Sequence, residues 1–424
     1  MNKPLTLIIM TLAITFLLTG CYDAHEIDDI THVLAIGIDR GVSDKWRLSL
    51  QFSTMKGESG GSEEEGNGGG SQGDYTYMTV DAPSFFAGVD MLNSSIPREL
   101  FFSHTELVAV SEDLAREGLM GEFISPLTRY TQIRGSTRLM VIKGSAQDFI
   151  KENEPYIGTT LSKAMETSAK ESMNIGYFGH TTLSDFYNDL KSTYRQPIIS
   201  IGAVNEFKNF KEDGPKWDGG FEDEGKYLAG ELPRYGQKKI EYWGTALFNG
   251  KKMIAELNGS DTRALLMVRG DFQRGFFTMQ DPKVPDLIIP LDIRPDGAPE
   301  VKMGFQDDVP NIDLTVPLKG DILAIQSTLH YEEDPLLSLL ERTFERKIKD
   351  EIDKLINRCK GMGIDVFQFG DISARYFATI PEWEEYNWNN KFKDAKVTTQ
   401  VKLVIKRAGT RTKSSPIPNR REGE

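Results

Sequence analysis

The amphipathic segment 335–358 constrains the fold of this chain more than any other feature. Apolar side chains recur there every three or four positions, and charged side chains occupy the opposite face, as in a helix with one buried side. Asp334 as N-cap, Pro335 at the first helical position and Gly361 past the end would delimit a helix of ~36 Å. The alternating segment 397–405 is the expected strand cover, and a partner-binding groove is the less favoured interpretation. The stripe consists of Leu336, Leu340, Phe344, Ile348, Ile352, Leu355, Ile356 and Cys359.

Length and composition predict a body of two or three folded domains. At 424 residues the chain is too long for one ordinary hydrophobic core. Hydrophobic residues make up 39% and the mean hydropathy is −0.38. After residue 21 there is no apolar stretch of the ~18 residues that a membrane helix requires, so the body is not expected to cross a bilayer. A net charge of −13 argues against nucleic acid as a partner.

The N-terminus has the features of a bacterial lipoprotein signal peptide. Lys3 supplies a positive charge, residues 5–18 are apolar, and Leu18-Thr19-Gly20-Cys21 forms a lipobox. Removal of residues 1–20 and attachment of diacylglycerol (palmitate-type chains) to the Cys21 sulfur would give two acyl chains, which stable anchoring requires. A retained transmembrane helix is less favoured, because the apolar run is shorter than the ~20 residues needed. Cys359 would then be the only thiol, which excludes an intramolecular disulfide and a zinc ribbon.

The first half of the chain alternates strand and helix signals. Residues 33–38 and 46–52 predict a hairpin, and Thr182 with Asp185 predicts a capped helix over 182–190. We therefore expect an N-terminal α+β domain over residues 21–205. The glycine, serine and glutamate segment 57–74 inside it has nothing to bury and is expected to be a disordered loop. The charged segment 206–240 is expected to be a linker or a surface loop.

The second half is expected to form a C-terminal α+β domain over residues 241–409, with a possible subdivision near 303–314. Asn249-Gly250 between two apolar runs predicts the hairpin that opens it, and Asp261 is expected to cap the next helix. Residues 410–424 are expected to be a disordered tail. The fold class predicted is α+β (mixed α/β), with two to three packed domains, mixed or antiparallel sheets, and the long helix of the C-terminal domain packed on a sheet.

No motif in the chain predicts catalysis, a cofactor or a metal. The letters of a G-x-S-x-G nucleophile elbow occur at 57–61, but inside the glycine-rich loop and not between a strand and a helix. No phosphate-binding glycine loop is present. His104 is expected to be a hydrogen-bonded core residue. The five histidines have no metal-ligand spacing: His25, His32, His104, His180 and His330.

A cluster of aromatic residues lies near the C-terminus, comprising Trp383, Tyr386, Trp388 and Phe392. Packing under the final strand is the favoured interpretation, and docking of a partner is the alternative.

Four passages, taken in order behind the lipobox, resemble the Ger(x)C family of spore germination lipoproteins, the C subunits of nutrient germinant receptors. Tyr22 stands where tryptophan is typical, and Gln368 where glycine is often found. The resemblance covers about residues 18–409, and neither 57–74 nor 410–424 has a counterpart. The passages are residues 21–29 leading to 34–39, residues 101–104 through 114–119, residues 244–248 with Leu257, and residues 365–370 with Pro381, Trp383, Trp388 and 401–409.

The resemblance implies a non-enzymatic subunit that assembles with a polytopic A subunit and a transporter-like B subunit. It also implies a mixed α/β body of three packed domains, located on the outer face of the cell membrane that becomes the spore inner membrane. Lipidated Cys21 would provide the anchor, and direct contact with the germinant stays open. The alternative is a solute-binding lipoprotein that delivers a small nutrient to a transporter. An exported hydrolase is a third possibility only if folding gathers residues that are scattered in the sequence.

Overall fold

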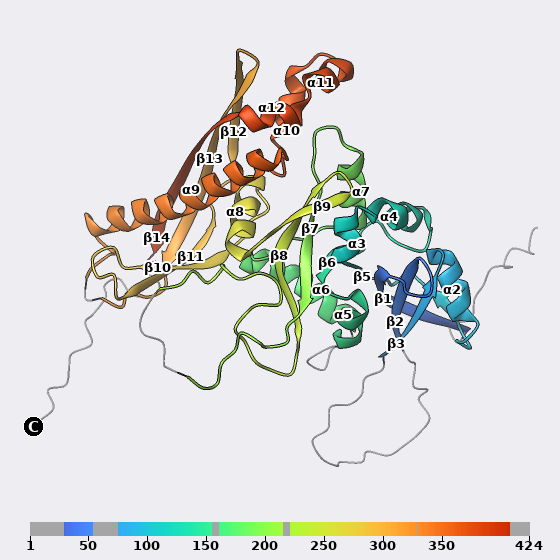
Figure 1. The fold of residues 1–424 in the computed structure, drawn as a ribbon. Helices are drawn as coiled ribbons and strands as arrows, with labels where there is room; N and C mark the ends of the chain where they lie inside the picture. The colour runs from blue at the N-terminus through green and yellow to red at the C-terminus, as the bar shows by residue number, and fades with distance from the viewer. Residues whose placement is uncertain (1–28, 54–74, 155–160, 215–220, 328, 408–424) are drawn as a thin grey trace, which may run out of the picture.

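The computed structural model describes residues 29–53, 75–154, 161–214, 221–327 and 329–407 (Figure 1). The predictions for residues 1–20, Cys21, 57–74 and 410–424 lie outside these ranges. Two sheets with helices packed on them make up the described chain, a nine-stranded sheet in the first half and a five-stranded sheet in the second. The predicted mixed α/β class is confirmed.

The nine-stranded sheet has a parallel centre and antiparallel edges. The pairs β1–β5, β5–β6 and β6–β7 are parallel, while β1–β2, β2–β3, β7–β8 and β8–β9 are antiparallel, and β4 pairs with the start of β1. The predicted first hairpin is β1–β2. The strands are β1 (Ile30–Arg40), β2 (Trp46–Ser53), β3 (Tyr75–Ala82), β4 (Glu99–Phe101), β5 (Leu107–Ser111), β6 (Arg138–Lys143), β7 (Ile198–Val204), β8 (Ile240–Asn249) and β9 (Lys252–Leu257).

Helices cover both faces of this sheet, because its strands are apolar on both sides. On β1, Ile36 and Ile38 pack with α2, α3, α4 and α7, whereas Ala35 packs with α5 on the other face. The capping box predicted for Thr182 and Asp185 is present at the start of α7. The helices are α2 (Phe85–Asn93), α3 (Glu112–Glu117), α4 (Met120–Arg129), α5 (Ala146–Glu152), α6 (Leu161–Ile175) and α7 (Leu183–Lys191).

The five-stranded sheet carries the long helix α9 (Leu336–Met362) across it (Figure 1). Strand β13 pairs with β11 and β12 on one side and in parallel with β14 on the other, and α9 packs on β14. The strands are β10 (Gly275–Gln280), β11 (Ile288–Pro295), β12 (Glu300–Gln306), β13 (Val309–Ile322) and β14 (Lys396–Arg407), and the other helices are α8 (Gly259–Arg269), α10 (Phe369–Ser373), α11 (Ile380–Tyr386) and α12 (Trp388–Asp394), with a 3₁₀ turn at Ala374–Tyr376.

The predicted stripe of α9 is confirmed, and its ends are shifted. All stripe residues except the half-buried Leu336 are buried against the sheet. The helix begins at Leu336 and ends at Met362, so Gly361 is still helical and Gly363, with φ of +68°, makes the left-handed cap. The N-cap is Pro335 and not Asp334, so the predicted cap is wrong; Asp334 instead accepts hydrogen bonds from the backbone N–H and the hydroxyl of Ser338.

Helix α9 also blocks the free edge of β14. The Glu345 carboxylate accepts a hydrogen bond from Leu403 N at 2.9 Å, and the Glu341 carboxylate accepts one from Ile405 N at 2.8 Å. Unpaired N–H groups along a strand edge would otherwise attract a strand from another chain. The polar side of the helix therefore satisfies the edge while the apolar side covers the face.

The structure changes two details that were predicted for the middle of the chain. The Asn249–Gly250 hairpin forms, and β8 pairs with β7, so the hairpin extends the first sheet and is not part of the second. The cap of α8 is Asn258, which accepts a hydrogen bond from Asp261 N, so Asp261 occupies the third helical position. The range 303–314 runs through the β12–β13 hairpin of one sheet, and the possible subdivision near it stays a prediction.

The segment 206–240 connects two neighbouring strands, β7 and β8, and its described part runs as a surface loop. The buried Glu241 carboxylate holds this loop by accepting hydrogen bonds from Gly230 N, the Asn205 amide and the Arg234 guanidinium. The loop is thus fixed to the sheet by a charge-assisted network. The domain limits 21–205 and 241–409 stay predictions.

The Cys359 thiol is expected to be unreactive in the folded protein. The residue is fully buried in the α9 stripe, and burial raises the pKa of its thiol to about 12. At pH 8 only about one thiol in ten thousand would be the reactive thiolate. Mass spectrometry after iodoacetamide treatment should show no modification of Cys359 in native buffer and complete modification in urea. Fast modification in native buffer would contradict the placement of this residue.

Candidate functional site

A cavity of about 390 Å³ lies between α7, the start of β7, the C-terminal end of α8 and the turn before α10. We call it the α7–α8 cavity. Its size falls in the lower part of the range for small-molecule sites. Its lining combines carboxylates, guanidinium groups and amides. The lining residues are Phe178, Gly179, His180, Thr181, Asp185, Asn188, Asp189, Arg195, Ile198, Leu266, Arg269, Gly270, Asp271, Gln273 and Gln368.

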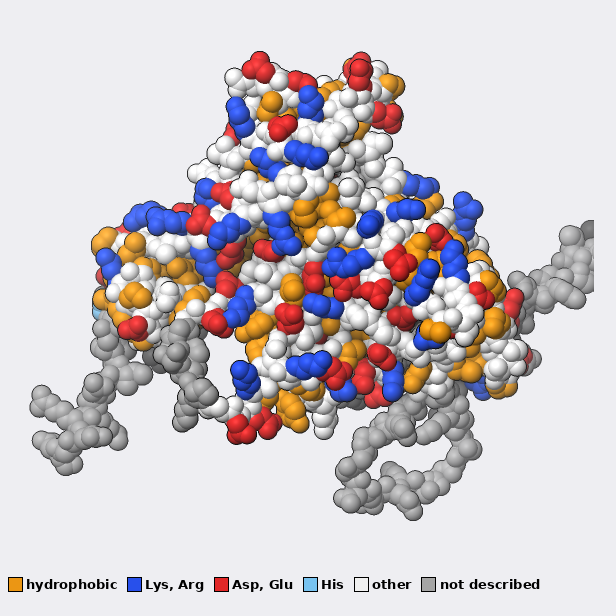
Figure 2. Space-filling model, viewed as in Figure 1, with side chains coloured by type: hydrophobic (Ala, Val, Ile, Leu, Met, Phe, Trp, Pro, Cys, Tyr) orange, Lys and Arg blue, Asp and Glu red, His pale blue; other side chains and the backbone are white. Residues whose placement is uncertain are grey.

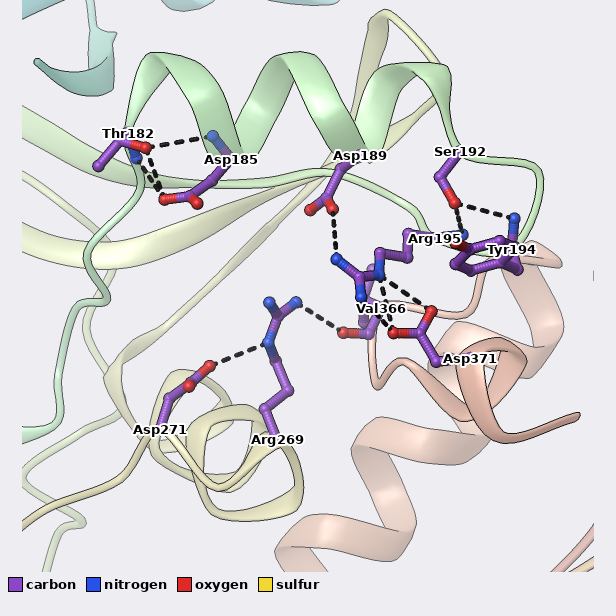
Figure 3. Close-up of polar contacts among 10 residues, drawn as sticks. All are labelled: Thr182, Asp185, Asp189, Ser192, Tyr194, Arg195, Arg269, Asp271, Val366 and Asp371. Atoms are coloured by element: carbon purple, nitrogen blue, oxygen red, sulfur yellow. Dashed lines mark hydrogen bonds and ion pairs between the residues drawn. The ribbon is translucent and has the colours of Figure 1, made fainter. Parts of the chain in front are cut away.

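Helix α7 presents one polar face to the cavity. Asp185, Asn188 and Asp189 follow the spacing of three and four that places side chains on one side of a helix. Asp185 is engaged with Thr182, whose backbone N–H and hydroxyl both donate to its carboxylate (Figure 3). Asp189 is only 8% exposed, and burial raises the pKa of its carboxyl although Arg269 and Arg195 oppose that shift.

Arg195 connects α7 to the C-terminal part of the chain. Its Nε lies 2.9 and 2.8 Å from the two carboxylate oxygens of Asp371, and its Nη2 lies 2.6 Å from Asp371 Oδ2 (Figure 3). The Ser192 hydroxyl accepts hydrogen bonds from the backbone N–H groups of Tyr194 and Arg195, which shapes the turn that carries the guanidinium. A bidentate pair of this kind is among the stronger polar contacts in proteins.

Arg269 makes the second connection from the last position of α8. Its Nε donates to the Asp271 carboxylate at 3.1 Å, and its Nη1 donates to the carbonyl oxygen of Val366 at 3.1 Å (Figure 3). The side chain is 11% exposed. The two arginines therefore reach the same C-terminal segment from two places, Arg195 from the turn after α7 and Arg269 from the end of α8.

That segment, which we call the 365–371 turn, is organised by the buried carboxylate of Asp365. Asp365 accepts hydrogen bonds from Phe367 N at 3.0 Å, Gly370 N at 2.6 Å and Trp388 Nε1 at 2.9 Å. Burial raises the pKa of this carboxyl to about 6, and the three donors oppose the shift. A Cβ on Gly370 would lie 2.4 Å from the Tyr194 carbonyl oxygen, so glycine is required where the turn meets the Arg195 segment.

Gln368 adopts a left-handed conformation in this turn, with φ of +66°. An L-residue with a side chain is strained there by roughly 1–2 kcal/mol, whereas glycine is not. Glutamine at position 368 therefore imposes a strain that glycine at the same position would avoid. The consequence is an additional amide side chain on the cavity wall.

The histidines are not gathered into one site. His180 lines the cavity, and burial followed by the charge of Arg138 lowers the pKa of its imidazole. His104 is exposed, with its ring centroid 4.4 Å from that of His32, so its prediction as a buried core residue is wrong. Among the described residues no group of three or more potential ligands could hold a metal. His25 lies outside the described residues.

The C-terminal aromatic cluster is packed inside the protein, as predicted, but against α9 and β13. Trp388 donates to Asp365, and Trp383 Nε1 donates to the Thr193 hydroxyl at 3.2 Å. The cluster therefore supports the 365–371 turn and the segment before β7. The cavity could not be predicted from the sequence because its walls come from three distant segments. The one signal in the sequence was the glutamine at position 368, where glycine is often found.

Outside the cavity, acidic and basic side chains are interspersed on the face seen in Figure 2, and no broad basic area is present on it. In the described part of the chain, none of the helices combines the length and apolar character needed to cross a membrane.

Family models match two consecutive parts of the chain. Residues 23–204 match the N-terminal domain of spore germination proteins, and residues 243–409 match the C-terminal domain described as spore germination B3/GerAC like. The second match includes the 365–371 turn, and the first includes α7 and Arg195. The cavity is thus built from both matched parts.

Two proteins that are called spore germination proteins are similar to this chain along nearly their whole lengths. Spore germination protein KC of Bacillus subtilis (strain 168) is 22% identical, over 98% of this chain and 98% of its own. Spore germination protein GerQC of Bacillus cereus is 20% identical, over 93% and 97%. The crystal structure of the GerBC protein has the same fold, with a TM-score of 0.52 and 14% identity over 87% of this chain and 96% of that one.

Proposed function

Because the chain belongs to the family of GerAC-like spore germination proteins, we propose that it is a non-enzymatic subunit of a nutrient germinant receptor complex. The observation that carries this proposal is the pair of family matches, in order, over residues 23–204 and 243–409. The similarity to proteins KC and GerQC over nearly complete chains supports it.

The proposed mechanism is assembly and not turnover. A lipid on Cys21 would confine the folded body to the outer face of the membrane, the spore inner membrane in the dormant cell. Confinement raises the effective concentration of the body near its integral-membrane partners, so weak interfaces suffice to form the complex. The proposed partners are a polytopic A subunit and a transporter-like B subunit.

Co-purification tests this proposal directly. The tagged, lipidated protein is extracted from spore membranes in mild detergent, and the recovered proteins are identified by mass spectrometry. We expect two polytopic proteins in amounts comparable to the tagged chain. An unrelated lipoprotein with the same tag serves as the control for detergent carry-over. Recovery of the tagged chain without any polytopic protein would contradict the receptor-subunit role.

A second candidate function, delivery of a small nutrient to a transporter, is favoured by one observation, the α7–α8 cavity. A delivery protein would act without a stable complex. The co-purification experiment separates the two functions, since stable recovery of both polytopic proteins supports the receptor subunit and not the carrier.

A further inference from the structure

The polar groups around the α7–α8 cavity leave one carboxylate without a full partner. Arg195 is paired with Asp371, and Arg269 with Asp271 and the Val366 carbonyl. Asp189 has only a longer ion pair with Arg195, and Asp185 is engaged with Thr182, so the group drawn in Figure 3 contains four carboxylates and two guanidinium groups. The group therefore has an excess of negative charge.

Asp189 is the position at which a compensating positive charge would be placed. The residue is more than nine-tenths buried, and Arg195 Nη1 lies 3.7 Å from its Oδ1, which is beyond hydrogen-bond distance. Among the described residues no hydrogen bond is found to its carboxylate oxygens. Its oxygens face the cavity, so water or an occupant of the cavity supplies the hydrogen-bond donors that the chain does not. The carboxylate lines the cavity, so an occupant of the cavity can reach it.

Three amide side chains also line the cavity. Asn188, Gln273 and Gln368 can each donate and accept hydrogen bonds. Gln368 holds a strained left-handed conformation at the wall, and such strain in a folded protein is concentrated at functional positions. One buried carboxylate among amides is a poor site for a divalent metal, which requires several oxygen ligands of its own.

We propose that the α7–α8 cavity binds a small polar solute that carries a protonated primary amine, with the ammonium group at the Asp189 carboxylate. The amides of Gln368, Gln273 and Asn188 bind its uncharged polar groups. The cavity volume of about 390 Å³ limits the solute to a small molecule. This inference goes beyond the receptor-subunit role and does not depend on it, because it concerns an internal cavity and not the membrane or the partners.

The test uses the full-length lipidated protein in detergent micelles and two pairs of probes. In each pair a hydroxyl replaces the amine: 3-aminopropan-1-ol with propane-1,3-diol, and 4-aminobutanamide with 4-hydroxybutanamide. Isothermal titration calorimetry or saturation-transfer NMR is expected to show saturable 1:1 binding of each amine, at least tenfold tighter than its neutral counterpart. Absence of saturable amine binding, or equal binding of the neutral probe, would overturn the proposal.

The Asp189→Asn variant tests the position of the charge. It is expected to weaken amine binding at least tenfold and to leave binding of the neutral probes unchanged. The control is Asp350→Asn, which removes the same charge from an exposed position of α9 and should bind as the parent does. If sodium binds saturably and this binding is lost in Asp189→Asn, the site takes an inorganic cation and the amine proposal is overturned.

The Gln368→Gly variant keeps the test decisive if Asp189→Asn does not fold. Glycine relieves the left-handed strain, so the thermal midpoint should rise. Binding of 4-aminobutanamide should weaken severalfold, more than binding of 3-aminopropan-1-ol, because one amide contact is lost. If the variant is stabilised but binds both amines with unchanged affinity, Gln368 does not contact the solute, and the proposal is contradicted. None of these measurements reads out the membrane partners, so the receptor-subunit role is tested separately.

Discussion

Replacing Cys21 with alanine is expected to move the protein from the membrane fraction to the soluble fraction. Each buried acyl CH₂ contributes about 0.8 kcal/mol to membrane binding, and two chains are needed for stable anchoring. In the described part of the chain none of the helices is long and apolar enough to cross a membrane. Cell fractionation with immunoblotting measures the redistribution, and we expect the membrane-bound share to fall from nearly all to a small minority.

The control for this experiment is Cys359→Ala, which removes the other cysteine of the chain. Cys359 is buried in the α9 stripe, so its replacement affects packing and not anchoring, and the variant should stay at the membrane. Nutrient-triggered germination should be lost in Cys21→Ala and retained in Cys359→Ala. Membrane retention of Cys21→Ala together with normal germination would disprove the anchoring hypothesis.

Replacing Asp365 with alanine is expected to destabilise the protein by about 3–5 kcal/mol. The substitution leaves Phe367 N, Gly370 N and Trp388 Nε1 without their acceptor in a fully buried site. An unsatisfied buried donor costs ~1–3 kcal/mol, and relief of the desolvated charge offsets part of the total. Urea unfolding followed by tryptophan fluorescence measures the change. A loss below about 1 kcal/mol would show that the 365–371 turn does not depend on this carboxylate.

Asp365→Asn is the matched variant, and it also isolates a pH dependence. The pKa of Asp365 in the folded protein is about 6, because burial raises it above the usual aspartate value of about 3.9. The folded state therefore holds the proton more tightly, and the contribution of this group to stability is largest below about pH 4. It is lost as pH rises from 4 through 6, by about 3 kcal/mol in total. The difference in unfolding free energy between parent and Asp365→Asn should change by that amount between pH 4 and pH 7, and a constant difference would contradict the raised pKa.

Several elements of the fold could be predicted because short stretches of sequence specify them. The α9 stripe follows from apolar residues spaced three and four apart, and the β8–β9 turn from an asparagine followed by glycine, with φ of +56° at Gly250. The capping box of Thr182 and Asp185 involves partners three residues apart. The predicted ends of helices were less accurate. Both Gly361 and Gly363 could end α9, and in the structure Gly363 caps the helix.

The candidate site could not be predicted, because nothing in the sequence distinguishes most of its residues from other residues of the same type. Asp189, Arg195 and Arg269 are three charged residues in a chain with 27% charged residues, and no spacing distinguishes them. The sheet to which β8 belongs could not be predicted either, because the apolar pattern of this strand fits both sheets. Its pairing with β7 depends on a 35-residue connection that is held in place by Glu241.

The sequence by itself determined the fold class, the long helix and its buried side, the expected anchor at Cys21 and the family, because each depends on local periodicity or on short motifs. The tertiary structure alone decided which sheet receives the β8–β9 hairpin and how the α7–α8 cavity is formed. Arg195 and Asp371 are 176 positions apart, and Arg269 and Val366 are 97 apart. Contacts of such separation depend on how whole sheets and helices pack, and no local pattern of residues encodes them.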